Sequence, residues 1–276
     1  MNVIIPLAGF GSRLRPHTYT KPKPLITVAG KPVLGHILDK LVAAGVSEVS
    51  FVVGYLGDQI EQYVSASYPD IHAHYHEQRE LNGQAPAVLL ARSSVSGPTL
   101  IVFVDTIAEA DLSQLDSETA DGVIYVKEVE DPRRFGVVQV DKNGFISRFI
   151  EKPSDTANKL VVIGMYYVKD AALLMDCCDE LMRRDIRTKG EYFLADAFNL
   201  MIARGARLRI ETVDVWLDCG KPETVLETNR FLLAHGHDNS ELWRNDRSVV
   251  VPPVYIHPSA RIENSVVGPN TSIGEN

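Results

Sequence analysis

The sequence has little of what would mark a secreted, membrane or disulfide-rich protein. It holds three cysteines in 276 residues, and two of them, Cys177 and Cys178, are adjacent, which suggests no disulfide framework. Every apolar run is far shorter than the roughly 20 residues of a membrane-spanning helix. The first run, Val3–Ala8, is too short for a signal peptide and has no basic segment before it. We therefore expect a cytoplasmic protein with no membrane partner.

Acidic residues are missing from the start of the chain. No Asp or Glu occurs before Asp39, although the whole chain carries a formal net charge of −8. A small-residue turn at Ala8–Gly11 is followed by a group of cations: Arg13, Arg15, Lys21, Lys23 and Lys31. Glycine lets backbone N–H groups approach phosphate oxygens, and Lys and Arg supply the compensating charge. The loop is expected to bind a polyanion, while the acidic balance of the whole chain argues against nucleic acid as a partner.

Composition and pattern predict an α/β protein. Hydrophobic residues make up 45% of the chain and charged residues 23%, which is ordinary for a globular protein. In the first 104 residues, strand-like apolar runs alternate with apolar stripes of helical period. The expected strands are Val3–Leu7, Val49–Val53, Ile71–His76 and Thr99–Val104, and the expected helices are Pro32–Ala44, Asp58–Ser65 and Ala85–Arg92. This alternation predicts a mostly parallel sheet with helices on both faces.

The pattern changes after the fourth expected strand. Short polar turns, including Asn143–Gly144, separate four further strand-like segments: Gly122–Lys127, Val137–Asp141, Ile146–Glu151 and Leu160–Val168. They predict an antiparallel insertion, so the sheet should be mixed. A strand is expected again at Leu208–Val213, and helices at Ala171–Met182, Tyr192–Ala203 and Pro222–Ala234.

The end of the chain carries a repeat signal. Residues 236–250 are polar and are interpreted as a linker. Apolar residues then recur at nearly six-residue spacing, at Ile256, Ile262, Val267 and Ile273, with one step a residue short. This spacing resembles the hexapeptide repeat of left-handed β-helices, and residues 251–276 would be the start of a truncated longer helix or an interaction edge. An ordinary β-segment is the alternative.

Three ordered motifs near the N-terminus resemble a known family. G-F-G-S-R-L (9–14), P-K-P-L (22–25) and G-K-P (30–32) are similar to the signature of the sugar-1-phosphate nucleotidyltransferases, in particular the glucose-1-phosphate thymidylyltransferase-like proteins. With further motifs downstream, the resemblance covers residues 1–235. It implies a catalytic domain over these residues with a Rossmann-like three-layer α/β fold and a mixed, mostly parallel sheet. A homo-oligomer is expected.

The resemblance implies a nucleotide site. Backbone of the first turn would contact the base and phosphates, at Leu7, Ala8, Gly9 and Gly11. Arg13 and Lys23 would grip phosphate oxygens and are the expected catalytic residues. Gln78, followed five residues later by Gly83, would read the base, because a Gln amide can donate to one pyrimidine edge atom and accept from another. This reading favours dTTP or UTP.

Two distant carboxylates are expected to bind Mg²⁺. Asp105 follows the apolar run L-I-V-F-V, and Asp218 lies in W-L-D-C-G-K-P. The resemblance implies that both hold Mg²⁺ against the triphosphate, and one or two carboxylates suffice when phosphates and waters complete the shell. The family commonly has Gly before the first Asp, where this chain has Val104.

The sugar-phosphate side is implied by three more motifs, R-F-G-V-V (134–138), F-I-E-K-P (149–153) and I-G-M-Y (163–166). Glu151 would accept hydrogen bonds from sugar hydroxyls, and Lys152 would neutralise the sugar phosphate. Gly136 and Gly164 would let the backbone approach the sugar ring.

The implied reaction joins a nucleoside triphosphate to a sugar 1-phosphate, with glucose 1-phosphate favoured, and releases pyrophosphate. Two alternatives stay open. A nucleotide-sugar-dependent glycosyltransferase would need a D-x-D acidic pair, and V-D-T-I (104–107) has only one acid. The other alternative is a non-catalytic subunit that binds sugar nucleotides or serves in assembly. It is disfavoured because the chain retains both aspartates, Asp105 and Asp218, and both key lysines, Lys23 and Lys152.

Two further features of the sequence could form sites. His72, His74 and His76 alternate, so a strand would place all three imidazoles on one face, where they could bind Zn²⁺. A half-exposed strand face is favoured instead, because no matching ligand cluster lies near them in the sequence. Cys219 is interpreted as a variant at the metal site and not as a nucleophile, since no partnered base is identifiable.

Overall fold

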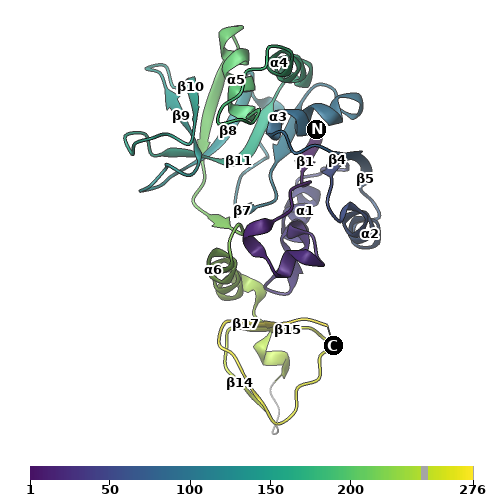
Figure 1. The fold of residues 1–276 in the computed structure, drawn as a ribbon. Coiled ribbons are helices and arrows are strands. Elements are labelled where there is room, and N and C mark those ends of the chain that lie inside the picture. Colours follow the sequence, from purple (N-terminus) through teal and green to yellow (C-terminus); the bar gives the residue numbers. More distant parts are fainter. Residues whose placement is uncertain (244–247, 276) are drawn as a thin grey trace. The chain divides into compact units, whose positions relative to one another are not determined.

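The computed structural model describes residues 1–243 and 248–275. The chain forms two compact units, each assembled from segments that are distant in sequence (Figure 1). The first unit comprises residues 1–10, 40–104 and 108–216, and the second comprises residues 11–39, 105–107 and those from 217 onward. In the described ranges, no helix combines the length and apolarity that crossing a membrane requires.

The first unit is built on a nine-stranded sheet. Its strand order is β10-β9-β11-β6-β1-β4-β5, with β8 beside β11 and β12 beside β8. The strands are β1 (Asn2–Pro6), β4 (Glu48–Val53), β5 (His72–Glu77), β6 (Thr99–Val102), β8 (Gly122–Glu128), β9 (Gly136–Val140), β10 (Ile146–Glu151), β11 (Leu160–Val168) and β12 (Leu208–Thr212). Strands β6, β1, β4 and β5 are parallel, whereas β11 is antiparallel to β6, β8 and β9. The expected mixed sheet, with an antiparallel insertion after a parallel start, is confirmed. The expectation that it is mostly parallel is wrong, because the insertion contributes four antiparallel strand pairings beside four parallel ones.

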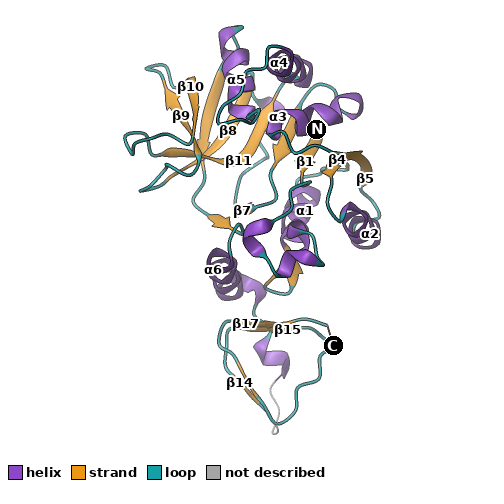
Figure 2. Cartoon of the chain, viewed as in Figure 1, coloured by secondary structure: helices purple, strands orange, loops and turns teal. Residues whose placement is uncertain are grey.

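Apolar side chains explain how this sheet is covered. Val3, Ile4 and Ile5 of β1 are fully buried, as a central strand requires. The helices of this unit are α2 (Gly57–Ser67), α3 (Gln84–Leu90), α4 (Ala171–Arg183) and α5 (Leu194–Ala203). Helices α3, α4 and α5 gather over the sheet strands in Figure 2, and their apolar side chains share one core cluster with those strands. Asp170 caps α4 by accepting hydrogen bonds from the backbone N–H groups of Ala172 and Leu173.

The second unit contains the basic loop and the C-terminal part of the chain. The loop runs through three short 3-10 turns and the antiparallel pair β2 (Thr27–Val28) and β3 (Lys31–Pro32). Helix α1 (Val33–Ala43) begins in this unit and confirms the expected Pro32–Ala44 helix. Strands β7 (Thr106–Ala108) and β13 (Trp216–Asp218) pair with each other, and helix α6 (Pro222–Leu232) follows.

The C-terminal segment folds back on itself in parallel. Strands β14 (Val249–Val250) and β15 (Val254–Ile256) pair with β16 (Val266–Val267) and β17 (Thr271–Ile273). Val249 lies opposite Val266 and Val254 opposite Thr271, so both ladders are offset by 17 residues. Three strict hexapeptides would give 18, and the single short step in the apolar spacing accounts for the difference. Val254, Ile256, Ala260 and Val267 form a small buried cluster of their own.

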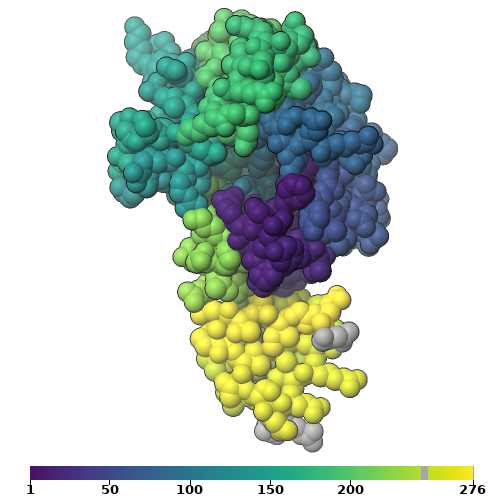
Figure 3. All heavy atoms as spheres, in the orientation of Figure 1, coloured from purple at the N-terminus to yellow at the C-terminus, as the bar shows by residue number. Residues whose placement is uncertain are grey.

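Within the second unit, the C-terminal segment packs on the loop that carries the G-K-P motif. The Asn229 side chain of α6 accepts hydrogen bonds from the Ala29 backbone N–H at 2.8 Å and the Ser272 hydroxyl at 2.7 Å. Gly30 has φ +82°, and the space where a Cβ would lie is filled by the Tyr255 ring. Figure 3 shows the atoms of the C-terminal segment, in yellow, directly beside those of the N-terminal loop, in purple.

Candidate functional site

Gly11 is a tightly packed position in the basic loop. It has φ +61°, and a Cβ there would come within 2.9 Å of the Lys23 Cβ and 3.0 Å of a Thr18 methyl group. The Thr18 hydroxyl closes the turn by donating to the Gly11 carbonyl at 2.9 Å. Because only glycine fits this conformation without strain, Gly11 lets the two arms of the loop approach each other. This approach fixes the start of the Lys23 side chain.

Lys23 faces the first of the two expected metal ligands. Its ammonium group lies 3.6 Å from Oδ2 of Asp105, and the side chains are 15% and 44% exposed. The Cys219 backbone N–H donates to the Asp105 carbonyl at 2.8 Å, which joins the segment around residue 105 to the segment around residue 218. Residues more than a hundred positions apart thereby become neighbours in one unit.

Hydrogen bonds from nearby residues hold Asp218 in place. Its Oδ1 accepts a hydrogen bond from the Gly220 backbone N–H at 2.7 Å, and its carbonyl accepts one from the Thr228 hydroxyl at 3.0 Å. A Cβ on Gly220 would lie 2.8 Å from that Oδ1 and 3.5 Å from a guanidinium nitrogen of Arg13. Gly220 thus leaves the space in which Arg13 approaches Asp218. No sequence pattern marks Gly220 as a site residue, although it lies in the motif W-L-D-C-G-K-P.

Two cations and two carboxylates therefore meet in the second unit: Arg13, Lys23, Asp105 and Asp218. They come from the N-terminal loop, the end of the β6 segment and the β13 segment. Carboxylate oxygens suit a hard cation such as Mg²⁺, and a guanidinium and an ammonium suit phosphate oxygens. The donor set fits a metal-assisted phosphate site.

The thiol of Cys219 lies inside this group. Its side chain is 2% exposed, and burial is the largest of the effects that raise the pKa of the thiol to about 12. The neighbouring charges of Asp218 and Asp105 raise it further, while the Thr228 hydrogen bond and the Lys23 charge oppose the shift. A thiol with this pKa is protonated at neutral pH and is a poor nucleophile.

We expect the cysteines of the native protein to resist a thiol-disulfide reagent at neutral pH. Cys177, Cys178 and Cys219 are all buried, and burial raises the pKa of each thiol. A titration with Ellman's reagent should show almost no release of the thiolate dye before unfolding and release from all three thiols in guanidinium chloride. Rapid labelling of Cys219 in the folded protein, located by mass spectrometry, would contradict its assignment as an inert site variant.

In the first unit, the turn after β1 carries three of the expected nucleotide-binding residues. The Leu7 backbone N–H donates to the Val52 carbonyl at 2.9 Å, so the strand pairing continues to the start of the turn. Leu7 and Ala8 are buried, whereas Gly9 is exposed and has open space where a Cβ would lie. Ala8 in turn lies against Gly54, where a Cβ would be 2.8 Å from the Ala8 methyl group. The turn is packed on one side and open at Gly9.

Gln78 and Gly83 are brought into contact. The Gln78 amide, 9% exposed, donates to the Gly83 carbonyl at 3.4 Å. Gly83 has φ +126° and forms a bridge to Tyr192, and a Cβ at Gly83 would collide with the Tyr192 carbonyl oxygen. The five-residue spacing therefore corresponds to a defined turn at the start of α3. Tyr192 is a contact that no local sequence pattern indicates.

The residues expected to bind the sugar phosphate also gather in the first unit. Gly136 pairs with Glu151 across β9 and β10, and a Cβ on Gly136 would lie 3.0 Å from a Glu151 carboxylate oxygen. Burial raises the pKa of Glu151, while the positive charge of Lys152, 4.0 Å away, opposes that shift. Lys152 has φ +47°, and its ammonium lies 5.0 Å from the centre of the Phe193 ring. Gly164 lies on β11, where Phe103 donates its backbone N–H to the Gly164 carbonyl.

Comparison with known proteins identifies the family of the chain. The nucleotidyl transferase family matches residues 2–235. The chain is 36% identical over 235 residues to the bifunctional protein GlmU of Methanocaldococcus jannaschii, with 84% of this chain and 54% of that protein covered. It is 33% identical over 230 residues to the UTP--glucose-1-phosphate uridylyltransferase AglF of Haloferax volcanii, with 81% of this chain and 93% of that protein covered.

A solved structure has a similar fold. The structure of UDP-glucose pyrophosphorylase complexed with UDP-glucose aligns with a TM-score of 0.72 at 21% identity, covering 85% of this chain and 98% of that one. The chain spans about half the length of the GlmU relative but nearly all of AglF. Because the family match extends over most of the chain, the chain belongs to the nucleotidyl transferase family.

Proposed function

We propose that this chain transfers a nucleotidyl group from a nucleoside triphosphate to a sugar 1-phosphate, giving a nucleoside diphosphate sugar and pyrophosphate. The observation that carries the proposal is the meeting of Arg13, Lys23, Asp105 and Asp218 in one unit. The similarity to AglF, whose name gives UTP and glucose 1-phosphate as its substrates, supports the same substrate classes here. Glucose 1-phosphate is the favoured sugar phosphate.

The proposed reaction is a direct displacement. A phosphate oxygen of the sugar 1-phosphate forms a bond to the α-phosphorus, the bond from that phosphorus to the bridging oxygen breaks, and pyrophosphate leaves. The nucleophile is already an anion, so no protein base has to remove a proton. What the chain must supply is alignment of two anions and compensation of the charge that builds up on the phosphates. Arg13 and Lys23 provide that compensation.

Asp105 and Asp218 are the proposed Mg²⁺ ligands. When bound, the ion would screen the charge of the triphosphate and polarise its oxygens. Lys23 already lies 3.6 Å from Asp105, so the carboxylate also holds the ammonium group in place beside the phosphate site.

The sugar phosphate is proposed to bind in the first unit. Glu151 would accept hydrogen bonds from the sugar hydroxyls, with Gly136 leaving room beside its carboxylate. Lys152 would neutralise the phosphate, and Gly164 would let backbone approach the ring. The left-handed backbone of Lys152 supports a specific placement of that side chain, because such strain persists only where the surroundings impose it.

Base recognition is proposed for Gln78 and Gly83, together with the turn residues Leu7, Ala8, Gly9 and Gly11. We expect dTTP or UTP to be used in preference to purine triphosphates. Replacing Gln78 with alanine should lower the ratio of kcat/KM for pyrimidine triphosphates to kcat/KM for purine triphosphates by about tenfold. This is the size of effect expected when one or two hydrogen bonds are lost. The measurement is turnover with dTTP, UTP, CTP, ATP and GTP on one sugar phosphate.

Gln62→Ala is the matched control for this measurement, because Gln62 is an exposed glutamine on α2. The control should leave the base preference as it is in the unaltered protein. Equal or better use of ATP or GTP by the unaltered protein would contradict the pyrimidine preference while leaving the reaction class standing.

We also propose a domain organisation. Residues 1–235 form the catalytic domain, residues 236–250 connect it to the end of the chain, and residues 251–276 begin a left-handed β-helix. Of these, residues 244–247 and 276 lie outside the described ranges. The parallel ladders with a common 17-residue offset support a coil of repeated turns. A homo-oligomer is the proposed assembly.

Release of pyrophosphate tests the reaction class. The purified protein would be incubated with Mg²⁺ and each pair from a panel of nucleoside triphosphates and sugar 1-phosphates. We expect pyrophosphate and a nucleoside diphosphate sugar from at least one pair. A glycosyltransferase would instead release a nucleoside diphosphate from a nucleotide sugar, and a binding subunit would release neither product.

A further inference from the structure

Strand β5 carries two histidines beside a carboxylate. His72 and His74 are two residues apart, so their side chains leave the same face of the strand. Glu48 on β4 is the register partner of His72, and His74 is its diagonal neighbour. The sequence showed the histidines but not Glu48, because the pairing of β4 with β5 joins residues that are 24 positions apart.

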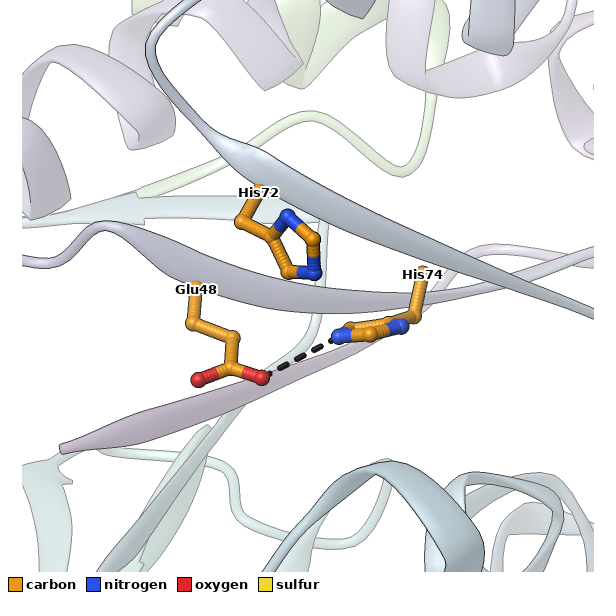
Figure 4. A group of neighbouring side chains, drawn as sticks. All are labelled: Glu48, His72 and His74. Carbon is orange, nitrogen blue, oxygen red and sulfur yellow. Dashed lines mark hydrogen bonds and ion pairs between the residues drawn. The ribbon is translucent and has the colours of Figure 1, made fainter.

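The three side chains converge. Each offers one ligand atom, and these atoms lie within 4.8 Å of one another. His74 Nε2 is 3.1 Å from Glu48 Oε1, and the centres of the two imidazole rings are 4.7 Å apart with the rings nearly perpendicular. Figure 4 shows both rings and the carboxylate clustered over the same part of the sheet, with the Glu48–His74 contact dashed.

A simple cross-strand pair explains only part of this arrangement. The contact between His74 and Glu48 could form without His72, yet the His72 ring is also directed into the group. His76 is the next residue on this face, but its Nε2 is bonded to the Ser94 hydroxyl at 3.1 Å. The convergent set is therefore three residues with two nitrogen donors and one oxygen donor.

We propose that Glu48, His72 and His74 bind a divalent transition-metal ion of the Zn²⁺ class. Two imidazoles and one carboxylate are a common set of zinc donors, with metal–ligand distances of about 2.0–2.2 Å. Tetrahedral geometry at those distances places ligand atoms about 3.3 Å apart, close to the 3.1 Å between His74 and Glu48. The third donor, on His72, lies within 4.8 Å of the other two and would have to move closer to reach that separation.

The site is open to solvent. The side chains of His74 and Glu48 are 31% and 46% exposed, and His72 is exposed as well. Water therefore completes the coordination, and the ligands lose little hydration when the ion binds. Mg²⁺ is a poor occupant because it prefers oxygen ligands, so this site differs in chemistry from the carboxylate pair Asp105 and Asp218.

Metal binding here would join two strands. Strand β5 lies at the end of the strand order, and its neighbour is β4. An ion held by Glu48 on β4 and by His72 and His74 on β5 cross-links them. Because the unfolded chain does not present these ligands together, the ion would raise the stability of the folded protein.

Calorimetric titration with ZnCl₂ tests the site on untagged protein. We expect binding of one ion per chain to this group, accompanied by a rise in the melting temperature. His72→Asn and His74→Asn should each weaken binding by at least about tenfold, since even indirect partners of a metal ligand are worth that much. His257→Asn is the matched control, because the His257 imidazole also faces one carboxylate, that of Glu275 at 3.6 Å.

Spectroscopy with Cu²⁺ counts the imidazoles directly. Electron paramagnetic resonance of the Cu²⁺ complex should show two coordinated nitrogens in the unaltered protein and one in His72→Asn. Unchanged Zn²⁺ affinity in the His72→Asn/His74→Asn double variant would overturn the proposal. So would a single coordinated nitrogen in the unaltered protein, or displacement of Zn²⁺ by millimolar Mg²⁺.

Discussion

Replacing Lys23 with alanine is expected to lower the rate of nucleotidyl transfer by at least about a hundredfold, the scale of losing one charged contact to a transition state. The Lys23 side chain is 15% exposed, and its ammonium group lies 3.6 Å from Asp105. Negative charge builds up on the α-phosphate and on the leaving pyrophosphate during the proposed reaction. Without the ammonium group, that charge loses one of the two loop cations proposed to compensate it.

The Lys23 prediction needs a variant that separates charge from packing. The Lys23 Cβ lies against Gly11, so alanine keeps that contact, and Lys23→Met keeps most of the side-chain stem as well. Both variants should be folded and similarly slow. Lys142→Ala is the matched control, because Lys142 is an exposed lysine outside the basic loop, in the turn between β9 and β10. Steady-state pyrophosphate release provides the rates, and circular dichroism checks the fold. Near-normal turnover in a folded Lys23→Met protein would contradict the role of the charge.

Local sequence patterns predicted the elements of the fold well. The buried strand β1, the stripe of α1 and the Asn143–Gly144 turn all depend on residues within a few positions of one another. Such features follow from periodicity and backbone preference, which a single sequence records. The expected spacing of Gln78 and Gly83 likewise corresponds to a contact in the structure.

Features that depend on pairing between distant segments were not visible in the sequence. Glu48 meets His72 because of the register between β4 and β5, and the sequence contains no signal for that register. The collision that makes Gly83 necessary comes from Tyr192, more than a hundred residues away. The Tyr255 ring over Gly30 is a third case. For these residues, sequence can suggest a role for one partner but cannot identify the other.

The same contrast between local pattern and long-range pairing applies to the expected site residues. Motifs selected Asp105 and Asp218 separately, and the resemblance implied that they act together. The hydrogen bond from Cys219 to the Asp105 carbonyl supplies the physical link between the two segments. Gly220 adds a steric requirement, since any side chain there would occupy the space between Asp218 and Arg13. The chemistry of each residue was evident from its type, whereas the geometry came only with the fold.

Neutralising either carboxylate is expected to change how the reaction depends on Mg²⁺. Asp105→Asn and Asp218→Asn each remove one negative charge with almost no change in size, and an amide oxygen binds a hard cation more weakly than a carboxylate. Each variant should need at least about tenfold more Mg²⁺ for half-maximal rate, and its rate at saturating Mg²⁺ should also fall. The measurement is the rate of pyrophosphate release against Mg²⁺ concentration at fixed substrates.

The two aspartates should differ in a second respect. Asp105 pairs with Lys23, so Asp105→Asn also frees an ammonium group, whereas Asp218 accepts its hydrogen bond from the Gly220 backbone. If Asp105 and Asp218 bind the same ion, the fold-loss of rate in the double variant should be smaller than the product of the fold-losses in the two single variants. The reason is that the second substitution acts on a metal site that is already weakened. Asp214→Asn, an exposed aspartate four residues before Asp218, should leave the Mg²⁺ curve unchanged. Fully multiplicative losses, or a Mg²⁺ requirement that neither single variant alters, would show that the carboxylates do not share a metal ion.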